Sequence, residues 1–128
     1  MEKTPIVIDT NIFIDHLRNY APSVQFFNSL AEREDIYFSA ITETELIAGK
    51  HNNDKQKREQ LLHFLHRWNK VILTNQLALR AGDISREYNL DVPDAIIAAT
   101  ATSQNATLLT KNIKDFRKVK SLTVQEPY

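Results

Sequence analysis

The chain has 128 residues and a formal net charge of zero, from 16 basic and 16 acidic side chains. This length predicts one domain over residues 1–128, and the balanced charge gives no general attraction to nucleic acid or membranes, although a local basic rim would still allow RNA binding. No cysteine is present and no apolar segment has the length of a signal peptide or a membrane span, so we expect a soluble cytoplasmic protein without disulfides or thiolate metal sites.

The first part of the chain predicts a buried strand that ends in an acid. The apolar run at residues 5–8 is typical of a strand in a parallel sheet, and Asp9 follows it directly. A short helix is predicted through residues 12–17, and a second helix carries Pro22 in its first turn. The next strand is predicted at residues 36–40.

The middle of the chain continues this alternation. Thr42 is predicted to cap a helix that ends at about Gly49, with Glu45 in the position of a capping-box acid. Apolar residues at helical spacing predict a further helix over residues 58–68, and a third strand is predicted at residues 71–74.

The last part of the chain has the same character. Its predicted elements are a helix capped by Asn75 and ended by a left-handed Asn89, a buried helix over residues 94–104 ended by Asn105, a strand at 106–110, a short turn capped by Asn112, and an edge strand at 122–124. Alternating strands and helices predict an α/β fold: a three-layer sandwich with a mostly parallel central sheet and helices on both faces.

Four acids occupy comparable places in this pattern. Asp9 ends a strand, Glu45 and Asp94 lie in the first turns of helices, and Asp115 follows the fourth strand. Each alone has an ordinary explanation as a helix-capping or surface residue. In a parallel sheet, however, strand ends and the starts of the following helices share one edge, so we expect all four acids to converge there.

Converging acids with no predicted basic partner repel one another. At about 5 Å and an effective dielectric constant of about 20, each like-charged pair costs on the order of 3 kcal/mol. A cation between the carboxylates would remove this repulsion, and oxygen ligands suit Mg²⁺ or Mn²⁺. The four histidines, which we expect on the surface or in packing roles, are His16, His51, His63 and His66. An acidic site of this kind favours metal-assisted hydrolysis of a phosphodiester.

Four segments of the sequence resemble the PIN-domain family, and within it VapC-type toxins of toxin–antitoxin pairs. These segments, in chain order, are Asp9-Thr10-Asn11 after an apolar strand, Glu45-Leu46 followed by Gly49, residues 93–101 around Asp94, and residues 109–116 around Asp115. The resemblance covers nearly the whole chain. It departs from the family pattern at Asn89 and Asn105, where similar proteins often carry glycine, and we expect both asparagines to take the left-handed conformation that glycine would have there.

The resemblance implies an Mg²⁺- or Mn²⁺-dependent endoribonuclease that acts as the toxin of a toxin–antitoxin pair. It makes Asp9, Glu45 and Asp94 the core metal-site acids, and Asp115 a fourth. Supporting polar roles fall to Thr10, Asn11, Thr110 and Asn112. Glu43 neighbours Glu45, and the choice of Glu45 rests on the Glu-Leu-x-x-Gly match. The family also implies a homodimer and a cognate antitoxin that lays a peptide across the active site.

Two other functions compete with a ribonuclease. A phosphatase of the haloacid-dehalogenase type also places an Asp after its first strand, but it needs a second Asp where this chain has Asn11. A non-catalytic RNA-binding or adaptor domain could have the same fold. The candidate RNA contacts, which could equally form a solvated charged surface, are Lys50, Arg86, Lys111, Lys114 and Arg117.

Overall fold

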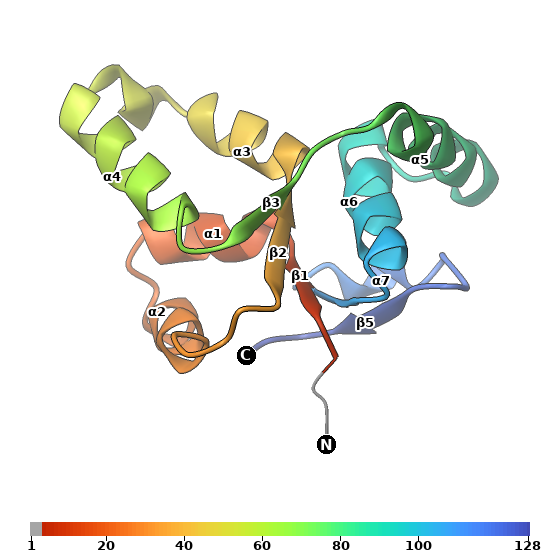
Figure 1. Ribbon diagram of the computed structural model, residues 1–128, viewed down its shortest axis with the longest axis horizontal. Coiled ribbons are helices and arrows are strands. Elements are labelled where there is room, and N and C mark those ends of the chain that lie inside the picture. The colour runs from red at the N-terminus through yellow and green to blue at the C-terminus, as the bar shows by residue number, and fades with distance from the viewer. Residues whose placement is uncertain (1–3) are drawn as a thin grey trace.

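The computed structural model describes residues 4–128 and is built on a five-stranded parallel sheet with the strand order β3-β2-β1-β4-β5 (Figure 1). The strands are β1 (Ile6–Ile8), β2 (Ile36–Ser39), β3 (Asn69–Val71), β4 (Thr107–Leu109) and β5 (Thr123–Gln125). The helices are α1 (Thr10–Leu17), α2 (Ala21–Ser29), α3 (Ala40–Ile47), the 3₁₀ helix η1 (Lys50–Asn53), α4 (Lys55–Leu65), α5 (Asn75–Tyr88), α6 (Val92–Ser103) and α7 (Ile113–Phe116). The predicted α/β fold with helices on both faces is confirmed.

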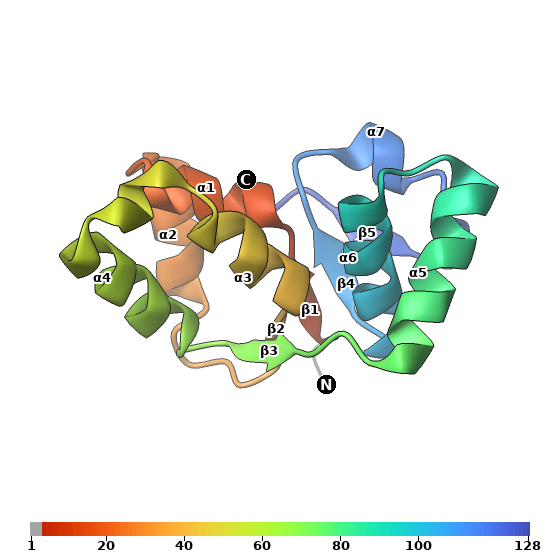
Figure 2. The same ribbon diagram turned by 90° about the horizontal axis from the view of Figure 1, so that it is seen from above.

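Two hydrophobic cores lie on opposite faces of the sheet. Successive side chains of a strand point to opposite faces, so Val7 packs with α5 and α6 while Ile6 and Ile8 pack with α1 to α4. Both groups of helices are visible in Figure 2, one on each side of the strands. All three residues of β1 are buried, as the apolar run predicts. No helix within residues 4–128 is long and apolar enough to cross a membrane.

The predicted third strand is displaced along the chain. Instead of residues 71–74, β3 comprises residues 69–71, and the side chains of Ile72 and Leu73 lie beyond it with 63% and 45% of their surface exposed. The pairing with β2 explains the shift, because it sets Tyr37 against Asn69 and Ser39 against Val71. Contact with the neighbouring strand therefore decides this register, against the apolar pattern of the sequence.

Two predicted helix caps are wrong by a few residues. Ser39, the last residue of β2, caps α3 by accepting a hydrogen bond from the Ile41 amide at 3.1 Å, so Thr42 lies inside the helix. Thr74 caps α5 in the same way, in place of Asn75. In both cases a hydroxyl residue nearer to the strand end takes the capping position.

The α5–α6 hairpin places Asp94 at one end of a buried helix. Asn89 ends α5 with a backbone φ of 54°, and Asn105 follows α6 with a φ of 51°, so both predicted left-handed turns are confirmed. The α6 segment from Ala95 to Ala101 is buried throughout, also as predicted. The Asn89 turn thus sets the direction from which α6 brings its first turn, and Asp94, to the sheet.

We predict that Asn89→Ala destabilises the protein by about 1 kcal/mol, because the Cβ of an ordinary L-residue is strained in the left-handed region. Asn89→Gly, which lacks a Cβ, should change the free energy of unfolding by roughly 0.5 kcal/mol or less. Denaturant unfolding of both variants measures the difference. Equal stability of the alanine and glycine variants would contradict the role of the left-handed turn.

Candidate active site

Asp9 is a buried carboxylate at the junction of β1 and α1. Its side chain accepts hydrogen bonds from the Thr10 amide at 2.8 Å and from the Thr110 hydroxyl at 2.7 Å, and the residue is 3% exposed. Burial raises the pKa of Asp9 above its ordinary value, the hydrogen bonds from Thr110 and Thr10 counteract this, and the charge of Glu45 raises the pKa further. Because Thr110 directly follows β4, the ends of two adjacent strands hold this carboxylate.

The Thr10 hydroxyl connects α1 to α3. It donates to Glu45 Oε1 at 2.8 Å and lies 2.9 Å from the Thr42 hydroxyl. Since the single proton of Thr10 goes to Glu45, Thr42 donates to Thr10. The buried Thr42 hydroxyl, expected as a helix cap, instead supports the hydroxyl that orients Glu45.

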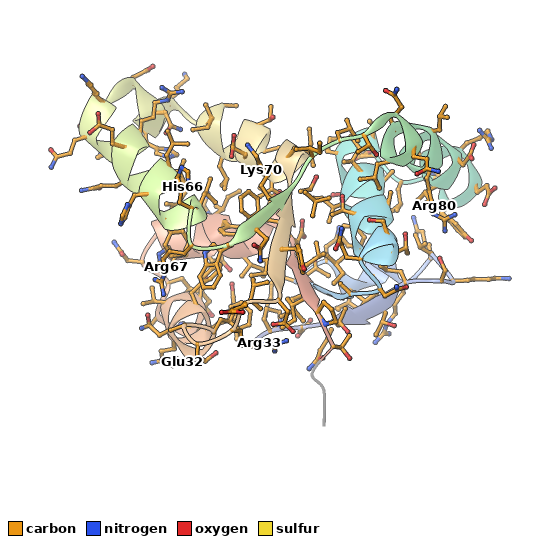
Figure 3. All side chains as sticks on the ribbon, viewed as in Figure 1. Glu32, Arg33, His66, Arg67, Lys70 and Arg80 are labelled. Atoms are coloured by element: carbon orange, nitrogen blue, oxygen red, sulfur yellow. The ribbon has the colours of Figure 1, made fainter. Side chains whose placement is uncertain are left out.

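Glu43 and Glu45, the two candidates for the acid on α3, have different hydrogen-bond partners. Glu43 accepts a hydrogen bond from Lys70 Nζ at 3.3 Å on the β3 side of α3, and Figure 3 shows Lys70 there. Glu45, two residues later, faces Thr10. The Glu45 side chain therefore belongs with Asp9, and Glu43 belongs to a partly exposed ion pair.

Asp94 lies in the first turn of α6 and is surrounded by other carboxylates. Its pKa is raised to about 6, first by burial and then by the charges of Asp9, Asp91, Glu45 and Asp115. The predicted convergence of the four acids is therefore present as an electrostatic interaction centred on Asp94. Asp91 adds a fifth carboxylate that the sequence analysis missed, and its position just before Val92 and Pro93, at the N-cap of α6, is the signal that could have found it.

Asp115 joins this group through Asn112 and Thr110. Asn112 Nδ2 donates to Asp115 Oδ2 at 3.1 Å, and the Asn112 amide donates to the Thr110 hydroxyl oxygen at 2.9 Å. Lys118 Nζ lies 3.7 Å from the other carboxylate oxygen of Asp115. The expectation that none of the four acids has a basic partner is thus wrong for Asp115, which lies one helical turn from that lysine.

The donor set fits a hard divalent cation by its chemistry. The acids offer only oxygen ligands and raise the pKa of Asp94 by mutual repulsion. As they stand in residues 4–128, no three carboxylate, thiol or imidazole side chains have the spacing that would hold an ion. No histidine charge acts on Asp94 or Asp9, and His16 instead stacks on Phe64 with ring centroids 4.2 Å apart.

The five candidate RNA contacts are all exposed. In chain order they are Lys50 on η1, Arg86 on α5, Lys111 after β4, Lys114 on α7 and Arg117 at the end of α7. Lys114 and Arg117 share the α7 region with Asp115. Arg86 forms an ion pair with Asp83 at 3.0 Å within α5. The Lys111 ammonium donates to the Tyr128 backbone oxygen at 2.7 Å. Asn11 is exposed at the start of α1.

Comparison with known proteins identifies the family. Residues 6–122 match the PIN domain. The chain is 32% identical to "Ribonuclease VapC19" of Mycobacterium tuberculosis, an alignment that covers 95% of this chain and 98% of the relative. It is 28% identical to "Ribonuclease VapC2" of Rickettsia felis, with 93% and 95% covered. A PIN domain over this length removes the basis for a haloacid-dehalogenase-type phosphatase.

Solved structures show the same fold. One chain of a toxin–antitoxin complex from Klebsiella pneumoniae is 30% identical to this chain with a TM-score of 0.78. The match covers 96% of this chain and 98% of that one. VapBC2 from Rickettsia felis, bound to a DNA fragment from its promoter, is 25% identical with a TM-score of 0.79, covering 94% and 97%. This chain therefore belongs to the PIN-domain family, and within it to the VapC ribonuclease toxins.

Proposed function

We propose that this chain hydrolyses RNA phosphodiester bonds as an Mg²⁺- or Mn²⁺-dependent endoribonuclease, with Asp9, Glu45, Asp94 and Asp115 as its catalytic and metal-holding acids. One observation carries the proposal: the charges of Asp9, Glu45 and Asp115, from three separate elements, all act on Asp94. A fold gains no stability from such a group of like charges, so a bound cation is the simplest reason for it. Membership of the VapC ribonuclease toxins supports the same activity.

The chain's own residues prepare this site. Asp9, Glu45 and Asp94 would hold the ion, with Asp115 at the side where Lys118 already neutralises part of its charge. Thr110 and Thr10 fix the orientations of Asp9 and Glu45 through hydrogen bonds of 2.7 Å and 2.8 Å. When bound, a divalent ion would supply positive charge for the phosphate and a lower pKa for an attacking water.

We also propose a protein partner, a cognate antitoxin, and a homodimer. Structural neighbours of this chain are toxin–antitoxin complexes. A cavity of about 1000 Å³ adjoins Glu45, and its accessible apolar lining residues Ile14, Leu17 and Phe64 suit an antitoxin segment laid beside the active site. Exposed apolar side chains that a second copy could cover are Ile72, Leu73, Leu79 and Val92.

Asp9→Asn and Asp94→Asn are each expected to reduce RNA cleavage by at least a hundredfold, because each removes a charge from the metal site. Cleavage of single-stranded RNA with Mg²⁺ or Mn²⁺, and with EDTA, measures this. Glu32→Gln is the control, since Glu32 is an exposed acid between α2 and β2, away from the site (Figure 3). Wild-type rates in both site variants would refute the site. A wild type that binds RNA but never cuts it would instead support the non-catalytic adaptor function.

The raised pKa of Asp94 predicts a pH-dependent stability. The native pKa, about 6, lies above the ordinary 3.8, so folding favours the protonated form and stability is lost as the pH rises through this range. In EDTA, Asp94→Asn should therefore be more stable than wild type above about pH 7, by about 1 kcal/mol because water screens a half-exposed group. The difference should vanish below about pH 4. Denaturant unfolding at both pH values measures it, and a variant destabilised equally at both would indicate a helix-capping role only.

Mg²⁺ is expected to raise the Tm of the wild-type protein, because a ligand that binds only the folded state stabilises it by mass action. At a hundred times its Kd the gain in stability is about 2.7 kcal/mol. The Asp94→Asn variant should gain much less. Thermal melts with EDTA, Mg²⁺ and Mn²⁺ provide the measurement, and a wild type indifferent to both ions would contradict the metal site.

A further inference from the structure

A second pocket, of about 530 Å³, lies along α1, the helix that begins directly after Asp9. It is lined by Asn11, Ile14, Asp15, Arg18, Tyr20 and Lys111. Asn11 is the second residue after Asp9, and Lys111 directly follows Thr110, whose hydroxyl donates to Asp9. The pocket is thus lined by residues that lie one or two positions along the chain from the two partners of this hydrogen bond.

Two cations face this pocket. Arg18 is exposed at the end of α1, and residues 4–128 offer its guanidinium no carboxylate within 4.0 Å. Lys111 Nζ contacts the Tyr128 backbone oxygen at 2.7 Å and lies 4.0 Å from Glu126, which leaves part of its three-donor capacity available. The carboxylate of Asp15 accepts a hydrogen bond from the Tyr128 hydroxyl, with 2.6 Å between the two oxygens. The charged lining therefore consists of two cations and one carboxylate, Asp15, which leaves the pocket with a net positive charge.

The pocket is also lined by an aromatic ring, that of Tyr20, which is not buried in the protein core. Tyr20 precedes α2 and is 49% exposed, and its ring centroid lies 5.9 Å from that of Tyr128. An exposed aromatic ring beside cations is the combination with which proteins bind single-stranded nucleic acid: the ring stacks on an unpaired base while the cations contact the phosphate.

We propose that this pocket holds the nucleotide adjoining the scissile phosphodiester of a single-stranded RNA, with Arg18 and Lys111 at its phosphate and Tyr20 stacked on its base. This inference rests on the proposed ribonuclease function. It also answers an electrostatic problem of that function, because a cluster of carboxylates repels the phosphates that flank the one being cut. Cations on the segments that follow Asp9 and Thr110 offset this repulsion and hold the strand in position.

The test measures affinity without cleavage. Binding of a fluorescent single-stranded RNA is followed by anisotropy in EDTA over a range of salt concentrations, and KM and kcat are measured separately with Mg²⁺. Tyr20→Leu should weaken binding about tenfold, the usual effect of losing one stacked base, and should raise KM more than it lowers kcat.

Arg18→Gln should weaken binding and reduce the slope of log affinity against log salt by about 0.7. A fully base-paired RNA of the same sequence should be bound less tightly and be insensitive to Tyr20→Leu.

Controls separate the pocket from general effects. Arg80→Gln removes an exposed arginine of α5, on the far side of the sheet from α1 (Figure 3), and should leave affinity and salt slope unchanged. Tyr20→Phe keeps the ring and should recover most of the affinity. If Tyr20→Leu fails to fold, Arg18→Gln and its salt slope decide.

The outcomes distinguish this inference from the ribonuclease proposal. Unchanged Kd and KM in Tyr20→Leu and Arg18→Gln, or equal losses in Arg80→Gln, would overturn the pocket while leaving cleavage intact. A wild type that binds single-stranded RNA through these residues but cuts none with Mg²⁺ or Mn²⁺ would overturn the ribonuclease and keep the pocket. A wild type that binds no single-stranded RNA under either condition overturns the pocket as well.

Discussion

The buried carboxylate of Asp9 is the constraint around which the rest of the site is arranged. A charge that is 97% removed from solvent is costly unless it is hydrogen-bonded, and both hydrogen bonds to Asp9 come from threonines at strand or helix ends. Thr110 can donate to it only because β4 pairs directly with β1, in the register that places Leu109 opposite Ile8. The order of the central strands therefore provides one of the two hydrogen bonds that oppose the rise in the pKa of Asp9 caused by burial.

The other acids are tolerated because they are less buried and are distributed over different elements. Glu45 is exposed and tied to Thr10, Asp115 is half-buried and paired with Lys118, and Asp94 carries the largest effect of mutual repulsion. The repulsion is thus concentrated on a residue in the first turn of α6, whose following segment from Ala95 to Ala101 is buried and holds it in place. A mobile loop would relieve the strain by moving the carboxylate away, and a packed helix does not allow that.

The sequence alone was enough to predict the fold class, the buried first strand, both left-handed asparagines and the approach of the four acids, because each depends on local chemistry or on the geometry common to parallel sheets. It was not enough for features that depend on partners distant in the chain. The register of β3 is set by β2, and Ile72 and Leu73 follow the strand instead of forming it. The Thr42 hydroxyl belongs to a contact with Thr10 across 32 residues, which no local capping pattern contains.

The hydroxyl of Thr110 links the two halves of the site. It donates to Asp9 and accepts from the Asn112 amide, whose side chain in turn donates to Asp115, so a displacement of the loop after β4 would be felt by both carboxylates. Lys111 lies within that same loop and lines the smaller pocket. A phosphate that engages Lys111 therefore acts on the segment that orients Asp9, and substrate position and carboxylate orientation become mechanically coupled. The start of this loop is fixed by the hydrogen bond from the Thr110 amide to the Gln125 backbone oxygen at 3.1 Å and by the Lys111 contact with Tyr128.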